Sequence, residues 1–359
     1  MAAIASTAEI EALITENAPV AIGVSGGKDS QASALATFAY LDSKGHTGPR
    51  VLVHADLGMV EWNASLPVCD RLAAHLGAEL IVVRRKAGGL MERWEARWQS
   101  SLRRYINLET VALVLPWSTP AMRFCTSELK THPIRAELRR RFKRCVFINV
   151  TGIRRQESAA RSKASVASVD AAGNADWRLI LDWMETEVFD FIAEQGLEVH
   201  EGYTEFGMSR ISCRFCIMSS AADLIAAAAV PESQDLLCRM VDLEIASTFA
   251  FQGNNKWLGD VAPHLLGFRR EEEFQNAKIR ALARIAIEAK VTKGMRYVSG
   301  WPTRMLTDHE AKILADVRRS IGLLFNIEPL YLDVPSIHGR YAALIADREK
   351  RQPSVHSAA

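Results

Sequence analysis

The sequence lacks the features that mark membrane, secreted and strongly charged proteins. No apolar run approaches the ~18 residues that a membrane-spanning helix needs. Residues 1–18 contain three glutamates and indicate an amphipathic helix, with no secretory signal. Lysine and arginine total 44 against 42 acidic residues, and a net charge of +2 does not by itself indicate a nucleic-acid-binding protein. We therefore expect a cytoplasmic protein without a membrane partner, whose six cysteines are not cross-linked.

Two common nucleotide-binding loops are also missing. The usual ATPase loop has four residues between its first glycine and a Gly-Lys-[Ser/Thr] end. Here three residues separate Gly23 from Gly27, and Asp29 follows Lys28. The dinucleotide fingerprint fails as well, because no third glycine follows at the required spacing.

The segment that does suggest phosphate binding is residues 25–30, Ser-Gly-Gly-Lys-Asp-Ser. It follows an apolar run at 20–24 and precedes a helical pattern. Glycines let the backbone approach an anion, and the N–H groups at a helix start point toward it. Lys28 adds a positive charge, and two serines add hydroxyl donors. A plain glycine-rich turn would need only one glycine, so we predict a nucleotide phosphate site.

The order of apolar runs predicts an α/β fold with a doubly wound, mainly parallel sheet. Strands are expected at 20–24, 51–57, 79–84 and 146–150, with a helix at 62–77. Ligands bind at the carboxyl ends of such strands, where three segments should converge through Ser25, Asp56 and Gly152.

The pattern changes after residue 220, where only helices are indicated, at 221–250, 270–291 and 307–323. We expect a nucleotide-binding and catalytic domain at 1–220, a C-terminal helical accessory domain at 221–350 and a frayed tail at 351–359. Basic residues cluster at 135–144 and 269–296, which favours either nucleic-acid contact or a solvated helix face.

Five segments together resemble a known family. Residues 25–30 resemble the PP-loop of the ATP pyrophosphatase (adenine nucleotide alpha hydrolase-like, Rossmann-like) superfamily. Residues 123–134, 152–161, 181–188 and 203–216 resemble the motifs of its phosphoadenosine phosphosulfate (PAPS) reductase-like family. The resemblance covers about residues 18–220 and includes the branch of DNA phosphorothioation sulfurtransferases.

The resemblance implies that ATP binds with Mg²⁺ and is cut between its α- and β-phosphates. Arginines beyond a strand end suit phosphate or sulfate oxygens, although a basic surface loop is the alternative, and Lys130 is either a further phosphate contact or a surface lysine. The expected catalytic residues are Lys28, Asp29, Arg154 and Arg161. The expected nucleotide-binding residues are Ser25, Gly26, Gly27, Lys28, Asp29, Ser30, Asp56, Gly152 and Arg154.

Three cysteines lie in the family segments. Cys213 and Cys216 have ligand-like spacing, and Cys125 lies in the other cysteine-bearing segment. In relatives, the corresponding turns hold a [4Fe–4S] cluster, which implies an iron–sulfur site here. Phe124 stands where cluster-bearing adenylyl-sulfate reductases have a second cysteine, so Cys238 is the only downstream candidate for a fourth ligand. The alternative is unligated thiols; Cys69 and Cys145 are expected in the core.

Three functions follow from these features. The first is an ATP-dependent sulfurtransferase that adenylylates DNA, RNA or a small molecule and takes sulfur from a donor such as a cysteine desulfurase. The second is a PAPS or adenylyl-sulfate reductase, which is disfavoured because no cysteine follows Cys238 to serve as the C-terminal redox residue. The third is a non-catalytic nucleotide-binding subunit of a defence or modification complex. Release of pyrophosphate from ATP discriminates among them.

Overall fold

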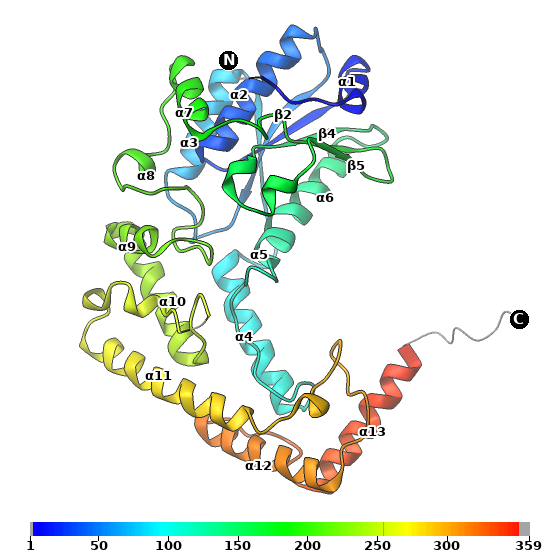
Figure 1. Ribbon diagram of the computed structural model, residues 1–359, viewed down its shortest axis with the longest axis vertical. Helices are drawn as coiled ribbons and strands as arrows, with labels where there is room; N and C mark the ends of the chain where they lie inside the picture. The colour runs from blue at the N-terminus through cyan, green and yellow to red at the C-terminus, as the bar shows by residue number, and fades with distance from the viewer. Residues whose placement is uncertain (1–2, 254, 352–359) are drawn as a thin grey trace, which may run out of the picture. The chain divides into compact units, whose positions relative to one another are not determined.

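The structure is a computed structural model that describes residues 3–253 and 255–351. It divides into two compact units, shown in Figure 1. The first contains the residues up to 92 together with 118–236, and the second contains 93–117 together with the residues from 237 onward. The units therefore do not follow a single cut near residue 220, because the chain enters the second unit twice. Residues 352–359, where a frayed tail was expected, lie outside the described residues.

The first unit is built on a mostly parallel sheet, which confirms the predicted fold class. Within the described residues the sheet has six strands in the order β3-β2-β1-β4-β6-β5, and only β5 runs antiparallel to its neighbour. The direction of winding reverses between β1 and β4, and ligands of such sheets bind at that switch point. The strands are β1 (Val20–Val24), β2 (Arg50–Asp56), β3 (Glu79–Arg84), β4 (Ile148–Thr151), β5 (Ala167–Val169) and β6 (Ala175–Trp177).

Helices cover both faces of this sheet (Figure 1). Successive strand residues point to opposite faces, so Val20 and Ile22 pack into one core and Ala21 packs into the other. The first core includes α1 (Ala8–Thr15), α2 (Lys28–Ser43), α3 (Ser65–Leu76) and α7 (Glu185–Glu194). The second core includes α6 (His132–Arg141).

The remaining helices of this unit are short. A π-helical turn at Ser127–Thr131 joins α5 to α6, and such turns are frequent at functional sites. Of the two cysteines expected in the core, Cys69 is buried on α3, but Cys145 is exposed. Cys145 was placed wrongly because β4 begins at Ile148, two residues after the predicted strand start at 146. The short helices are α5 (Phe124–Thr126), α8 (Glu201–Thr204) and α9 (Ala221–Ala229).

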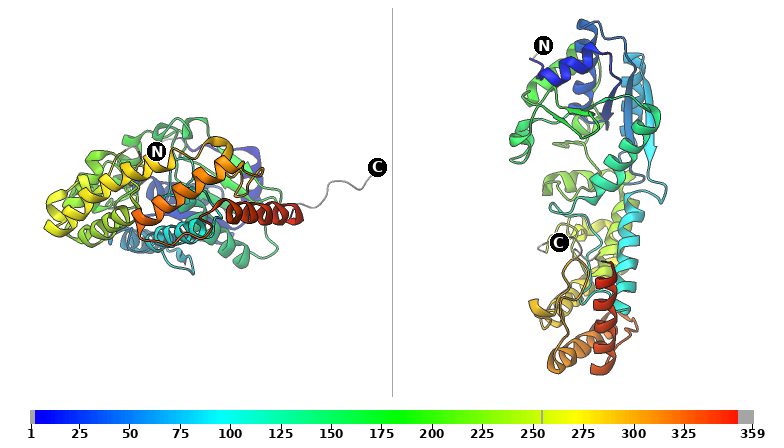
Figure 2. Two further views of the ribbon diagram at one scale, coloured as in Figure 1. Left: turned by 90° about the horizontal axis from the view of Figure 1, so that it is seen from below. Right: turned by 90° about the vertical axis from the view of Figure 1, so that its right-hand side faces the viewer.

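The second unit is helical. In it α12 lies against both α11 and α13 (Figure 2). The sequence did not predict α4, which contributes the buried Trp94 and Trp98. None of the described helices is long and apolar enough to cross a membrane. The main helices are α4 (Leu90–Ile106), α10 (Gln234–Ser247), α11 (Phe268–Glu288), α12 (Asp308–Phe325) and α13 (Val334–Arg351).

Two buried ionisable groups organise the second unit. The Arg318 side chain is fully buried and donates hydrogen bonds to the carbonyl groups of residues 105, 106, 330 and 331, which fastens the end of α4 to α12. Glu244, also fully buried, accepts hydrogen bonds from the amides of Phe251, Leu258 and Gly259. Burial raises the pKa of Glu244 to about 8 despite these three bonds.

Candidate active site

A cavity of about 490 Å³ opens at the carboxyl ends of the parallel strands in the first unit. This volume lies within the ordinary range for small-molecule sites. Its walls come from six stretches of chain that are far apart in sequence: residues 23–30 at the end of β1, 57–65 after β2, the helical segment at 123–135, residues 149–161 around the end of β4, residues 176–178 at β6, and residues 203–218. The predicted site residues that line it are Ser25, Gly27, Asp29, Ser30, Gly152, Arg161, Cys125, Cys213 and Cys216.

The loop after β1 has the geometry of a phosphate cradle. Gly26 has φ +78°, and a Cβ there would lie 2.9 Å from the Ser65 backbone, so glycine is required. Gly27 precedes the first turn of α2. The Ser30 hydroxyl donates to the Gly27 carbonyl at 2.9 Å and accepts from the Ser25 amide at 3.1 Å, which closes the loop on itself.

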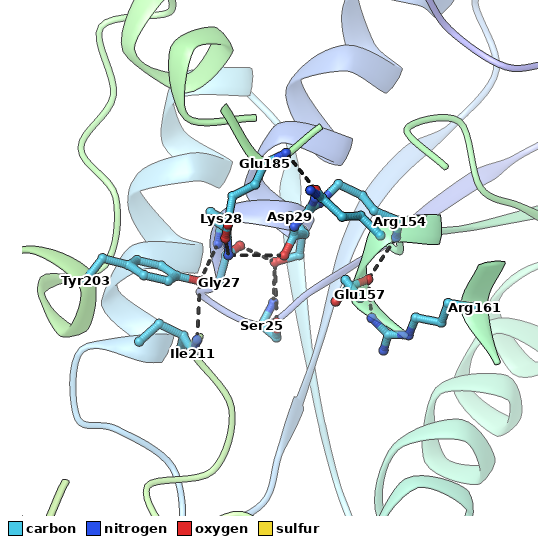
Figure 3. A network of polar contacts seen from close by, with 12 residues as sticks. Ser25, Gly27, Lys28, Asp29, Arg154, Glu157, Arg161, Glu185, Tyr203 and Ile211 are labelled. Carbon is cyan, nitrogen blue, oxygen red and sulfur yellow. Dashed lines mark hydrogen bonds and ion pairs between the residues drawn. The ribbon is translucent and has the colours of Figure 1, made fainter. Parts of the chain in front are cut away.

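Lys28 does not line the cavity, although its neighbours in the loop do. Its side chain is 3% exposed, and its Nζ lies 2.9 Å from the Glu185 carboxylate and 3.7 Å from that of Asp29. The ammonium also sits 4.9 Å from the Tyr203 ring centre and 5.4 Å from that of Phe189. Burial by itself lowers the pKa of Lys28, but Tyr203 and the two carboxylates outweigh it and raise that pKa. Lys28 is therefore a charged residue whose side chain is held by Glu185 and Tyr203 and does not line the cavity (Figure 3).

Arg154 also forms an ion pair within the protein, with Asp29. Its buried guanidinium donates to Asp29 Oδ1 at 2.5 Å and to the Gln156 side chain at 2.8 Å (Figure 3). Gly152 lies between them, where any Cβ would overlap the Asp29 carbonyl oxygen. This pair fixes the loop after β1 to the segment after β4.

Arg161 is the predicted arginine that faces the cavity. It forms an ion pair with Glu157, whose carboxylate also accepts from the Arg154 amide at 2.8 Å. Asp56, in contrast, is not among the lining residues. Its carboxylate accepts from the Gly58 amide at 2.7 Å and pairs with Arg84 at 3.2 Å, so it shapes the turn after β2.

The three family-segment cysteines lie on the walls of the same cavity. Burial, followed by the neighbouring Cys216, raises the pKa of the Cys213 thiol far above its usual range. As donors, three thiols suit an iron–sulfur cluster. Across the part of the chain that the structure describes, however, no three His, Cys, Asp or Glu side chains are arranged to hold a metal ion. Cys238 lies on α10 in the second unit and is not among the cavity residues.

The sequence analysis missed one buried pair at the cavity. His54 lies on β2, is 1% exposed, and contacts the Val24 carbonyl at 3.1 Å and the Glu61 carboxylate at 3.2 Å. Burial by itself lowers the pKa of His54, but the contacts with Cys69 and Glu61 raise it to about 10. Glu61 lines the cavity. The sequence did contain a signal for this pair: His54 is a histidine within an otherwise apolar strand, and a buried histidine needs a hydrogen-bonding partner.

The cavity lining carries more positive than negative side chains. The four carboxylates each face a cationic partner: Asp29, Glu61, Glu157 and Asp176. The lysine and arginine residues that line it are Arg123, Lys130, Arg135, Arg161, Arg178 and Arg210. An anionic ligand is therefore favoured.

Comparisons with known proteins give a family and several distant structures. The chain resembles PAPS reductase from Candida auris in a phosphate complex (16% identity, TM-score 0.37, 59% of this chain and 98% of that one). It resembles a U34-tRNA thiolase from Methanococcus maripaludis with its [4Fe–4S] cluster (13% identity, TM-score 0.35, covering 72% of this chain and 86% of that one). It also resembles an NH₃-dependent NAD synthetase from Campylobacter jejuni in complex with nitrate (15% identity, TM-score 0.29, covering 76% of this chain and 92% of that one). No curated protein matches the chain.

The family is shown by a match over more than half of the chain. The model described as the phosphoadenosine phosphosulfate reductase domain matches residues 19–219. That range contains every residue that lines the cavity. As its motifs predicted, the chain belongs to the phosphoadenosine phosphosulfate reductase domain family.

Proposed function

We propose that this protein is an ATP-dependent sulfurtransferase that adenylylates an acceptor, releases pyrophosphate and then exchanges the adenylyl group for sulfur. One observation carries the proposal: the phosphate loop and three cysteines line a single cavity. A phosphate loop alone would fit many nucleotide-binding proteins. Thiols in the same cavity bring sulfur to the atom that the nucleotide activates.

The phosphate end of the cavity suits attack on the α-phosphate. The acceptor oxygen would form a bond to the α-phosphorus while the bond to the α,β-bridging oxygen breaks, and pyrophosphate leaves with the electron pair. Gly27, Ser30 and Arg161 line the cavity and would bind phosphate oxygens. Asp29, which lines the cavity, is the loop carboxylate that would hold a nucleotide-bound Mg²⁺, and that metal would neutralise charge on the leaving group.

The sulfur end would act in a second step. A persulfide on one cysteine would attack the activated acceptor atom, and AMP would leave with the electron pair of the broken bond. A second cysteine thiol would then release the sulfurated product by thiol–disulfide exchange, leaving a disulfide that an external dithiol reduces. The sulfur itself would come from a donor such as a cysteine desulfurase.

Cys125, Cys213 and Cys216 are also the residues that would hold a [4Fe–4S] cluster. Such a cluster, with three protein ligands, would supply an open iron position for sulfur. Anaerobic purification should then yield iron and acid-labile sulfide, and Cys213→Ser should remove both. Iron-free protein from anaerobic preparations would exclude the cluster while leaving the persulfide route intact.

The acceptor is proposed to be a nucleic acid, giving DNA phosphorothioate modification or RNA thiolation. The excess of cationic side chains in the cavity supports an acceptor with its own phosphates. Protein incubated with [³⁵S]cysteine, a cysteine desulfurase and ATP should label DNA or transfer RNA. Label in neither polymer, with pyrophosphate still released, would restrict the acceptor to a small molecule.

The test of the reaction uses ATP labelled at the α-phosphate. We expect labelled AMP, either free or linked to the acceptor, together with released pyrophosphate. We expect no ADP. Lys28→Ala should abolish the release, because it removes the ammonium that supports the loop. Lys44→Ala is the matched control, since Lys44 follows the other end of α2 and pairs with Glu11. Formation of ADP, or binding of ATP without cleavage, would refute the proposal, and the latter outcome would support a non-catalytic nucleotide-binding subunit.

Reduction of a sulfated nucleotide is the second candidate, and the matched family favours it. PAPS or adenylyl sulfate would occupy the same anionic site, and its sulfate would be reduced to sulfite by electrons from an external dithiol. Incubation with either nucleotide and reduced thioredoxin discriminates the two functions. Sulfite release that Cys213→Ser and Cys216→Ser abolish would establish the reductase and exclude the transferase as the primary activity.

A further inference from the structure

The segment that carries two of the cavity cysteines rests directly on the phosphate loop. A Cβ placed on Gly27 would lie 3.5 Å from both the Ile211 carbonyl and the Tyr203 hydroxyl. Ile211 is two residues before Cys213. We use the name cysteine turn for residues 209–216. The loop and the cysteine turn are therefore in contact, and movement of one must be accommodated by the other.

One oxygen atom joins the two segments. The Tyr203 hydroxyl accepts a hydrogen bond from the Lys28 amide and another from the Ile211 amide, each at 3.3 Å (Figure 3). Lys28 begins α2, so its amide is one of the helix N-terminal donors that bind anions in a phosphate loop. A side chain of the protein thus occupies a donor that a phosphate oxygen would use.

The bond from the Lys28 amide to Tyr203 is a weak competitor for a phosphate. At 3.3 Å it is longer than the usual N–H···O range, and both partners are neutral. Hydrogen bonds to an ionised acceptor are shorter and roughly twice as strong. A phosphate oxygen should therefore displace the phenol.

Displacement of Tyr203 would affect two other groups. Its ring lies 4.9 Å from the Lys28 ammonium, which also pairs with Glu185. When the ring moves, Lys28 loses this contact and keeps the ion pair with Glu185. The Ile211 amide would lose its acceptor, and with it the bond that fastens the cysteine turn to the loop.

We propose that Tyr203 is a positioning residue that couples nucleotide binding to the cysteine turn: phosphate displaces its hydroxyl from the Lys28 amide and frees the Ile211 amide. The part of the turn around Ile211 then loosens, between the bonds that hold Ser209 to Asp223 and Arg214 to the Val60 carbonyl. This inference rests on the proposed nucleotide site, although it needs neither cleavage of ATP nor transfer of sulfur. It orders the proposed reaction, because the segment that leads to Cys213 loses its bond to Tyr203 only after the nucleotide has bound.

The test is amide hydrogen exchange of the full chain with and without α,β-methylene-ATP, which cannot be cut at the relevant bond. Peptides covering 24–31 should become protected. The Ile211 amide, followed in peptides covering 205–216, should exchange about fivefold faster, the factor expected when one neutral hydrogen bond is lost. Simple shielding by a ligand would slow both, so the opposite signs identify the coupling.

A matched pair of variants separates the role of the hydroxyl from that of the ring. In Tyr203→Phe, residues 205–216 should exchange rapidly without nucleotide and should not respond to it. Tyr40→Phe removes a phenol from the same unit that hydrogen-bonds Glu11 instead, and it should respond as the unaltered protein does. Should Tyr203→Phe fail to fold, the unaltered protein alone still decides the question.

The outcomes are distinct. Protection of 24–31 with unchanged or slower exchange at 205–216 would overturn this inference and leave the proposed function standing. Absence of protection at 24–31 would overturn both. A normal nucleotide response in Tyr203→Phe would also overturn it.

Discussion

The buried carboxyl of Glu244 should make the second unit less stable as the pH rises. In an unfolded chain a glutamate loses its proton near pH 4.5, whereas burial raises the pKa of Glu244 in the folded protein to about 8. Between those values the folded state holds a proton that the unfolded state has lost, so folding stability falls with increasing pH. At about 1.4 kcal/mol per pH unit, the full loss is about 5 kcal/mol and is complete above pH 8.

Glu244→Gln isolates this contribution. The neutral amide can keep the bonds from Phe251 and Leu258, which share one carboxylate oxygen, but its NH₂ group faces the Gly259 amide. Losing that acceptor should cost about 1–3 kcal/mol at pH 5. At pH 8.5 the variant should be the more stable protein by roughly 1–3 kcal/mol, because it carries no ionised carboxylate.

Urea unfolding at the two pH values, followed by hydrogen exchange in α10, measures the stability of this unit. The expected result is a crossing of the two stability curves between pH 5 and 8.5. Curves that stay parallel would refute the reasoning, since they would show that Glu244 has the same pKa in the folded and unfolded states. A variant that is less stable at both pH values by the same amount would have lost a hydrogen bond and nothing else.

Three further predictions concern other residues. Gly152→Ala should weaken binding of α,β-methylene-ATP by at least about tenfold in calorimetry, because the added methyl overlaps a carbonyl of the phosphate loop; Gly339→Ala, with open space around it, should bind normally. Arg318→Met should lower the unfolding free energy by roughly 4 kcal/mol, since four buried carbonyls lose their donor; a loss below about 1 kcal/mol would contradict this role. In Glu61→Gln the pKa of His54 should fall from about 10, as seen in the ¹⁵N shifts of its imidazole; an unchanged pKa would show that the contact with Cys69 alone raises it.

Local sequence was sufficient to predict the parts of the fold that depend on neighbours along the chain. The apolar runs gave β1 to β4 to within two residues, because buried parallel strands need no polar alternation. The residue types of the phosphate loop also indicated a tight turn. In the structure, Gly26 has a positive φ that favours glycine, and the Ser30 hydroxyl bonds the backbone of the loop.

The rest depends on contacts between distant parts of the chain. β5 and β6 have three residues each, too few to produce a pattern. The Lys28 side chain points toward Glu185 and Tyr203, which lie more than 150 positions away in sequence. Their effect on Lys28 could not be seen in the loop itself. The predicted roles of Lys28 and Arg154 stay predictions, now with the partners that hold each side chain identified.

The excursion of residues 93–117 into the second unit has a consequence for how the protein can be made. Trp94 and Trp117 pack on each other and on Phe251, and Trp98 packs on Phe249 and Phe325. During synthesis these tryptophans leave the ribosome more than a hundred residues before their covering helices exist. A chain cut after the family-matched region, near residue 220, would keep α4 and lose its cover, leaving an apolar surface that promotes aggregation. We therefore expect the family-matched region to aggregate when it is expressed alone, because residues 93–117 need the helices of the second unit to cover them.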